Sequence, residues 1–451
     1  MNTTARPATV APAPLAPLAS ALRSGELSVR DAVEHALERI DAHDASIHAL
    51  LPESGRRERL LREAADLERR YPEPSARPPL YGVLIGVKDI FAADGFETRA
   101  GSRLPPELFA MPEGPVVSAL RRSGALVLGK TVTTEFAYFA PGPTANPWDT
   151  ARTPGGSSSG SAAAVAAGFC SLALGTQTIG SISRPAAFCG ISGWKPSYER
   201  TSRAGAVPFS PSLDHVGLLA PDAAGLSLAA PVIATDWSAS AYTQALEKYS
   251  QRRPILVVPD GPYLAQTDAA ALATFEATIL RLRSAGFSII RMNALEDIEE
   301  INARHRRIAA AEMERTHRAW FAKHARLYAE ATRELILKGA AIGDDALELD
   351  RNGQTSLRRM LERALEEAGA EFWISPAALG PAPAGLDATG SPLMNLPWTH
   401  AGVPTLALPA GLSAEGLPLG IQIAGNFGSD ENLLALGVAL EPTLQAALAG
   451  R

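Results

Sequence analysis

Length, composition and charge exclude several classes of protein. The chain has 451 residues, 46% of them hydrophobic and 20% charged, which is enough apolar sequence for a large core. The net charge of −6 gives no reason to expect nucleic acid or an anionic membrane as a partner. Cys170 and Cys189 are too few for a disulfide framework or a zinc site, so we expect a cytoplasmic protein without a bound metal.

The N-terminal region is predicted to be a tail followed by two scaffold helices. Residues 1–20 are rich in alanine, proline and threonine, and the prolines interrupt every apolar run, so we expect a disordered tail without a signal peptide. Ser28 and Asp31 resemble a capping box and precede apolar residues at helical spacing. A strongly charged second helix is predicted over residues 56–70. No segment has the unbroken apolar length of a membrane helix.

A predicted buried strand over residues 80–90 carries a lysine, Lys88, near its end. Lysine is rarely buried without a partner, because desolvating an ammonium group is costly. One interpretation is an ion pair with the neighbouring Asp89. The other is a catalytic base whose pKa is lowered by burial.

A helix leading into a strand is predicted over residues 116–128, with a turn near Gly124. The aromatic residues Phe136, Tyr138 and Phe139 follow, and a loop is predicted over residues 141–149. These aromatic side chains either line a substrate pocket or pack in the core. The residues alone leave both interpretations open.

Two loops rich in glycine and hydroxyl side chains are the most distinctive feature of the chain. They span residues 153–161 and 175–181, and an alanine-rich predicted helix joins them. A flexible linker is one interpretation, but linkers do not alternate with apolar helices. Clustered hydroxyls beside glycines, which allow close backbone approach, are typical of a nucleophile site.

The same residues allow a serine nucleophile with a lysine base. A serine hydroxyl needs a base within hydrogen-bond reach, and lysine is a known alternative to histidine. A relay from Lys88 through Ser157 to Ser181 would let a neutral lysine take the proton. Backbone N–H groups around Gly180 would then converge on an oxyanion.

The second half of the chain alternates predicted strands and helices. Asp214 and His215 offer a Ser-His-Asp triad as an alternative, although such partners usually come from separate parts of a chain. His305 and His317 lie among arginines without a metal-ligand partner, and we predict that they are surface residues. Strands are predicted near residues 253–259, 287–291, 372–377, 402–411 and 419–425, and helices near residues 267–284, 294–338, 356–368 and 431–441. This alternation predicts an α/β fold with a mixed sheet covered by helices on both faces.

At the two glycine-rich loops the sequence also resembles the amidase signature family of serine hydrolases. The resemblance is carried by residues 155–166, 175–178, 187–190 and 194–196, with residues 86–89 and 416–422. It implies one α/β amidase domain over residues 21–451, with a helix-rich substrate-side region at about 237–370. It also implies hydrolysis of the C–N bond of a small or medium carboxamide through a seryl acyl-enzyme, without a cofactor. The products would be a carboxylic acid and ammonia or an amine.

The resemblance assigns roles to individual residues. Lys88 matches the catalytic lysine, Ser157 the bridging serine on a cis peptide bond, and Ser181 the acylated nucleophile. The expected oxyanion hole consists of Thr178, Ile179, Gly180 and Ser181. The expected substrate contacts are Phe136, Tyr138, Ser158 and Gln177.

The chain departs from the common family pattern at three positions. Gln177 stands where many members have aspartate, and Arg184 lies one place later than the usual arginine, a combination that resembles one branch of the family. Ile179 stands where glycine is usual. A β-branched residue at positive φ is an outlier. Either φ is negative at Ile179 and its side chain narrows the acyl pocket, or the oxyanion loop is rearranged.

Two further functions fit the resemblance. The chain is alternatively the amidase-type subunit of an amidotransferase, which requires a partner protein. It is also alternatively an amidase-like binding protein whose catalysis is impaired by Ile179. As partners we expect a small-molecule amide and a possible homodimer, the commonest symmetric assembly.

Overall fold

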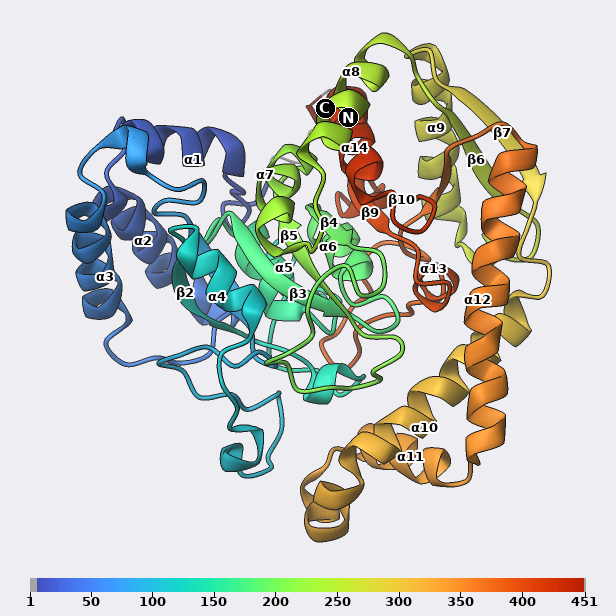
Figure 1. The fold of residues 1–451 in the computed structure, drawn as a ribbon, viewed down its shortest axis with the longest axis horizontal. Coiled ribbons are helices and arrows are strands. Elements are labelled where there is room, and N and C mark those ends of the chain that lie inside the picture. The colour runs from blue at the N-terminus through green and yellow to red at the C-terminus, as the bar shows by residue number, and fades with distance from the viewer. Residues whose placement is uncertain (1–5, 450–451) are drawn as a thin grey trace.

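A single mixed β-sheet runs through the protein, and the computed structural model describes residues 6–449 around it (Figure 1). The strands of this sheet are β1 (Leu84–Lys88), β2 (Leu126–Thr131), β3 (Leu172–Gln177), β4 (Ser192–Lys195), β5 (His215–Ala220), β6 (Ile255–Asp260), β7 (Ser288–Asn293), β8 (Phe372–Pro376), β9 (Thr405–Leu412) and β10 (Pro418–Ala424). Their order across the sheet is β2-β1-β3-β5-β4-β9-β10-β8-β6-β7. Parallel pairs form both ends of the sheet and antiparallel pairs form the middle, as a mixed sheet requires.

Helices cover both faces of the sheet, which confirms the predicted α/β class. They are α1 (Leu15–Ser24), α2 (Val29–Ile47), α3 (Arg56–Arg70), α4 (Pro115–Arg122), α5 (Ser159–Ala166), α6 (Ser183–Cys189), α7 (Ala223–Ile233), α8 (Ala239–Gln251), α9 (Ala269–Ser284), α10 (Ile298–His324), α11 (Glu330–Ala340), α12 (Asp344–Glu367), α13 (Leu396–His400) and α14 (Asp430–Ala449). Short 3₁₀ helices lie at Pro74–Ala76, Pro106–Phe109, Glu135–Ala137, Leu264–Gln266 and Ala325–Leu327. Helices α5 and α6 contact each other and the sheet, and α7 and α14 form a second such pair.

The parallel pairing of β1 with β3 places the two predicted parts of the site together. Its register aligns Ile85 with Leu172 and Val87 with Leu174. The carboxyl ends of parallel strands meet at one edge of a sheet. Lys88, at the end of β1, therefore reaches the same edge as the loop that follows β3 and carries Ser181. Every residue of α5, the alanine-rich helix between the glycine-rich loops, is buried.

The prediction of a disordered tail over residues 1–20 is wrong for the described part of that segment. Helix α1 begins at Leu15, and its apolar side chains Leu15, Ala19 and Leu22 are buried. Val10 is also buried. The prolines lie before and within the first turns, where the missing N–H of proline costs little. Residues 1–5 lie outside the described residues.

Helices α10, α11 and α12 form an arm at one side of the molecule in Figure 1, within the predicted helix-rich region. The prediction that His305 and His317 are surface residues is wrong, because both are fully buried. His305 lies beside His400, with ring centroids 5.5 Å apart, and His317 packs 4.5 Å from Phe136. Charged neighbours in sequence do not indicate exposure here, since a helix turns a new face outward within each turn.

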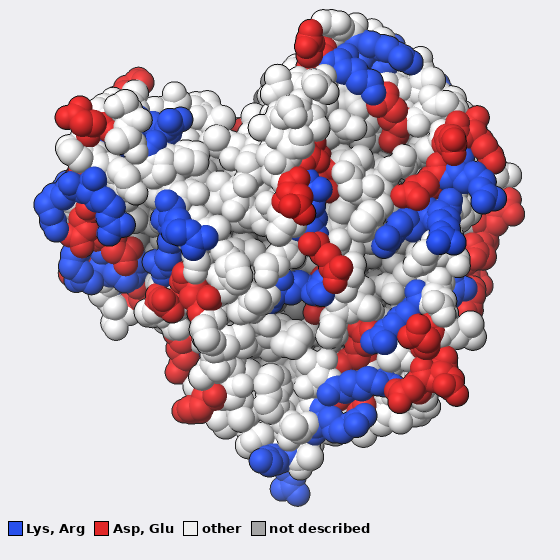
Figure 2. Space-filling model, viewed as in Figure 1, with Lys and Arg blue, Asp and Glu red and all other residues white. Residues whose placement is uncertain are grey.

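The visible surface carries charges of both signs. Figure 2 shows lysine and arginine interleaved with aspartate and glutamate, without a broad area of one sign on this face. Among the residues that the structure describes, no helix is both long and apolar enough to cross a membrane. The same residues contain no cluster of three or more histidine, cysteine, aspartate or glutamate side chains that could hold a metal ion.

Candidate active site

Lys88 is fully buried and contacts two hydroxyl groups. Its Nζ lies 2.7 Å from Ser157 Oγ and 2.8 Å from Thr176 Oγ1. Burial lowers the pKa of Lys88 well below its usual value, and the negative charge of Asp214 opposes this only in part. A neutral amine has a lone pair that can accept the proton of Ser157.

The alternative of an ion pair between Lys88 and Asp89 is wrong. Asp89 pairs with Lys130, whose Nζ lies 2.8 Å from the Asp89 carboxylate, and both side chains are buried. The Asp89 carboxylate also accepts hydrogen bonds from the N–H of Arg99. Consecutive residues of a strand point to opposite faces, which keeps Lys88 and Asp89 apart.

Ser157 follows the cis peptide bond between Gly156 and Ser157, as the family resemblance implies. The N–H of Thr134 donates to the carbonyl of Ser157 over 3.3 Å. The next residue ties the two glycine-rich loops together, because the N–H of Ser158 donates to the carbonyl of Ser181 over 3.4 Å.

Ser181 lies in the loop between β3 and α6 and is 6% exposed. No hydrogen bond joins its Oγ to Ser157 Oγ or to another described residue. The structure therefore contains the first link of the predicted relay, between Lys88 and Ser157. The second link, between Ser157 and Ser181, stays a prediction.

Side chains from distant segments hold the predicted oxyanion loop in place. Thr178 Oγ1 donates to Asp214 over 2.6 Å, and Thr399 Oγ1 donates to the Ile179 carbonyl over 2.7 Å. A Cβ at position 180 would lie 2.4 Å from Asn395 Oδ1, so only glycine fits there without displacing Asn395. These contacts define the path of the backbone whose N–H groups would bind an oxyanion.

Ile179 adopts an ordinary backbone conformation and is not among the described residues with positive φ. Its side chain belongs to an apolar cluster with Met394 and Leu396 and faces a cavity. Of the two alternatives for this position, the structure corresponds to the one in which the side chain narrows a pocket.

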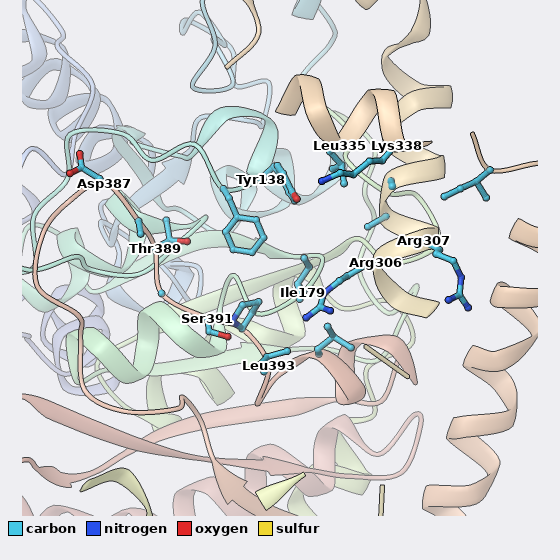
Figure 3. A pocket seen from close by; sticks show the side chains of 18 residues that line it. Tyr138, Ile179, Arg306, Arg307, Leu335, Lys338, Asp387, Thr389, Ser391 and Leu393 are labelled. Atoms are coloured by element: carbon cyan, nitrogen blue, oxygen red, sulfur yellow. The ribbon is translucent and has the colours of Figure 1, made fainter. Parts of the chain in front are cut away.

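An apolar cavity of about 760 Å³ opens beside this loop (Figure 3). Tyr138 and Phe139 line one part, Thr389 another, and Ile179 brings the nucleophile loop to its wall. Ser181 itself is not part of the lining. Ile179, two residues earlier, is the point at which the predicted oxyanion loop and the cavity meet.

Tyr138 lines the cavity as the substrate prediction requires, but Phe136 and Ser158 do not. Phe136 is 1% exposed and packs among aromatic rings, including Tyr328 at 5.3 Å. Ser158 Oγ is buried, donates to the Thr176 carbonyl and accepts from the Thr176 N–H, each over 3.3 Å. Neither side chain has a free face toward the cavity, so both predicted substrate contacts are wrong.

Gln177 is not a substrate contact either, because both ends of its amide are bonded within the protein. Its Oε1 accepts from the N–H of Ile182 at 2.8 Å and of Ser183 at 2.9 Å, and its Nε2 donates to Thr399 Oγ1 over 3.0 Å. The side chain is fully buried. Gln177 therefore shapes the turn that carries Ser181.

Replacing Gln177 by methionine is expected to lower the free energy of unfolding by about 1–3 kcal/mol, because two buried N–H groups lose their acceptor. Urea unfolding measures the change. Gln251→Met is the matched control, since the Gln251 side chain is exposed and bonds only to Glu247. Equal stability of the two variants would contradict this role for Gln177.

The alternative of a Ser-His-Asp triad is not supported. The Asp214 carboxylate accepts from Thr178 Oγ1 and from the N–H groups of Phe209 and Ser210. His215 Nδ1 lies 2.7 Å from the Leu213 carbonyl, and its Nε2 has no hydrogen-bond partner among the described residues. Burial lowers the pKa of His215 well below its usual value.

Sequence reasoning missed two residues of the site. Thr176 contacts Lys88, and its position follows from the register of β1 and β3. Thr389 lines the cavity and accepts from Arg184 Nη2 over 3.1 Å. Thr176 lies within a loop that the sequence singled out, whereas no sequence signal marks Thr389, which is more than 200 residues away from Arg184.

A mixed α/β fold with a buried lysine bonded to a serine of a glycine-rich loop defines the class of amide hydrolases. The chain belongs to the amidase family, whose model, described as Amidase, matches residues 31–434. It is 34% identical to the amidase-type chain of the Glutamyl-tRNA(Gln) amidotransferase from Synechococcus sp. (strain CC9311), over 92% of this chain and 93% of that protein.

Solved structures of amidases share the fold. A crystal structure described as amidase has a TM-score of 0.83 and 31% identity, covering 96% of this chain and all of that chain (100%). The native peptide amidase from Stenotrophomonas maltophilia has a TM-score of 0.82 and 27% identity, covering 96% of this chain and 97% of that chain. The family resemblance and the fold predicted from the sequence are thus confirmed.

Proposed function

We propose that this protein hydrolyses the C–N bond of a small or medium carboxamide through a seryl acyl-enzyme, without a cofactor. The contact of 2.7 Å between Lys88 Nζ and Ser157 Oγ carries the proposal. Lys88 has no salt bridge to a carboxylate among the described residues, and its lowered pKa favours the neutral amine that a base requires. Membership of the amidase family supports the same reaction.

The proposed reaction has two halves. Ser181 Oγ attacks the amide carbonyl carbon while its proton passes to Ser157 and the proton of Ser157 passes to Lys88. The tetrahedral intermediate then collapses, the C–N bond breaks, and the proton returns through Ser157 to the leaving nitrogen. Water attacks the resulting ester along the same relay, which releases the carboxylic acid and restores Ser181.

Backbone N–H groups over residues 178–181 are the proposed donors to the oxyanion, since donors held by the surrounding fold need no reorganisation during the reaction. Thr399 and Asp214 hold this loop from outside. The acyl group of the substrate would occupy the cavity bounded by Ile179. The hypothesis of a site impaired by Ile179 loses its main argument, because Ile179 has no positive φ.

A second candidate function is that of the amidase-type component of an amidotransferase. The similarity to a chain of the Glutamyl-tRNA(Gln) amidotransferase supports it. Such a component would pass ammonia to a partner protein instead of releasing it. Hydrolysis of simple amides by the purified chain alone would favour the stand-alone enzyme, whereas hydrolysis that depends on a co-purifying protein would favour the amidotransferase component. The homodimer and the cytoplasmic location stay predictions.

Covalent labelling by a fluorophosphonate tests the proposed function. We expect one phosphonyl group per chain, and mass spectrometry of the digested protein should find it on Ser181. Ser181→Ala should remain unlabelled, while the matched control Ser183→Ala should label like the unaltered protein. Equal labelling of Ser181→Ala and the unaltered protein would overturn the assignment of the nucleophile.

A further inference from the structure

The charged side chains that line the cavity are mostly basic. Arg306, Arg307 and Lys338 come from helices α10 and α11, and Asp387 is the acidic residue among the lining. In Figure 3 Asp387 lies at the far side of the cavity from Arg306, with Thr389 and Ile179 between them. A cavity otherwise lined by apolar groups uses such charges to orient a ligand.

Two of these cations are already satisfied elsewhere. The Arg307 guanidinium donates to the Asp350 carboxylate at 2.7 and 2.8 Å and to Glu300 at 2.9 Å, and it points away from the cavity in Figure 3. Lys338 lies 3.7 Å from Glu334 at the exposed rim, and solvent screens that pair. Neither cation is available to bind a ligand strongly.

Arg306 differs from its neighbours because its guanidinium has no ion pair and no hydrogen bond with any described residue. It lines the cavity together with Ile179, and in Figure 3 its guanidinium lies on the side of Ile179 and Leu393. Its charge also reaches Tyr138, where it acts to lower the pKa of the phenol, although burial outweighs this and raises that pKa overall. The free guanidinium thus faces the space that the acyl group of a substrate would occupy.

A second cation without an acidic partner lies behind the cavity wall. Arg184 is fully buried and donates to the Gly156 carbonyl at 2.6 Å and to Thr389, while its Nε and Nη1 have no partner among the described residues. Burial lowers its pKa to about 9, so it is still charged at neutral pH. In a site of low dielectric constant this charge makes an anion near Thr389 more favourable.

We infer that the cavity accepts amides that carry a carboxylate, and that Arg306 binds this carboxylate while the amide group faces Ser181. The inference rests on the proposed function, because it assumes that Ser181 reacts with the amide. A guanidinium presents paired N–H donors that match both oxygens of a carboxylate. Arg306 is then a specificity-determining residue of the substrate site.

Isosteric pairs of substrates isolate the effect of the charge. Succinamate and succinamide, or glutaramate and glutaramide, differ in size very little, but only the first of each pair carries a carboxylate. We expect kcat/KM to be at least about tenfold higher for the anionic amide of the better pair, as a charged hydrogen bond predicts. Arg306→Gln should reduce this preference by about tenfold or more.

Arg307→Gln is the matched control. It removes the same charge one residue along α10, but its guanidinium is already bound to Asp350, so the preference for the anionic amide should remain. A second measurement does not depend on turnover. Succinate should slow the labelling of Ser181 by a fluorophosphonate in the unaltered protein and in Arg307→Gln, but not in Arg306→Gln.

The outcomes separate the inference from the proposed function. If Ser181 is labelled but neither a preference nor protection by succinate depends on Arg306, the inference is overturned and the proposed function stands. If no amide is hydrolysed and Ser181 is not labelled, the proposed function fails and the inference fails with it.

Discussion

Replacing Ser181 by alanine is expected to lower kcat/KM by roughly 10⁴-fold or more for every amide that the protein hydrolyses. Without the hydroxyl no acyl-enzyme forms, and the remaining rate enhancement comes from substrate binding and the oxyanion donors alone. Steady-state kinetics on an amide that the unaltered protein turns over measures the loss. Because Ser181 Oγ makes no hydrogen bond to a described residue, the fold should not depend on it.

Ser183→Ala provides the matched control for this experiment. Ser183 lies two residues after Ser181, and its buried Oγ has no hydrogen-bond partner among the described residues. Removing that hydroxyl leaves no partner unsatisfied, so kcat/KM should change by less than about tenfold. A Ser181→Ala variant that retains activity similar to Ser183→Ala would show that another group is the nucleophile.

Replacing Lys88 by methionine is expected to lower kcat/KM by roughly 10³- to 10⁴-fold, because general-base catalysis is lost while a side chain of similar shape fills the site. Stability should move the other way. The folded protein disfavours protonated Lys88, so replacing it with an apolar residue removes a desolvation cost at neutral pH. Thermal unfolding at pH 7 should occur at the same or a higher temperature.

Lys130→Met is the contrasting control for Lys88→Met. Both lysines are buried, but Lys130 pairs with Asp89, and removing one partner of a buried ion pair costs about 3–5 kcal/mol. We therefore expect Lys130→Met to lose stability and Lys88→Met to lose activity. The reverse result would mean that Lys88 has a structural role.

The pH dependence follows from the same environment of Lys88. Only the neutral amine accepts a proton, so kcat/KM should rise with pH through the lowered pKa and then level off. For stability, the cost of burying Lys88 is fully present below its folded pKa and disappears as pH rises toward the unfolded value of about 10.4. An activity profile that is flat from acidic to alkaline pH would contradict a lysine base.

The candidate site shows which residues sequence reasoning can assign. Lys88 is recognisable because a lysine in an apolar strand conflicts with burial, and Ser157 because it lies in a glycine-rich loop of hydroxyl residues. Gln177 and Phe136 stand in or near the same segments, and their predicted roles in substrate binding are wrong. A local pattern shows that a side chain is buried or polar, but it does not show which partner satisfies it.

By itself the sequence determined the class of fold, the order of most strands and helices, the two glycine-rich loops and the family. These features are local or extend continuously along the chain, so periodicity and motifs record them. Only the tertiary structure decided which atoms meet. The pairing of β1 with β3 brought Thr176 to Lys88, and contacts across more than 200 residues brought Thr399 to Ile179 and Thr389 to Arg184. Such contacts depend on how the whole sheet closes around its helices, which no short stretch of sequence encodes.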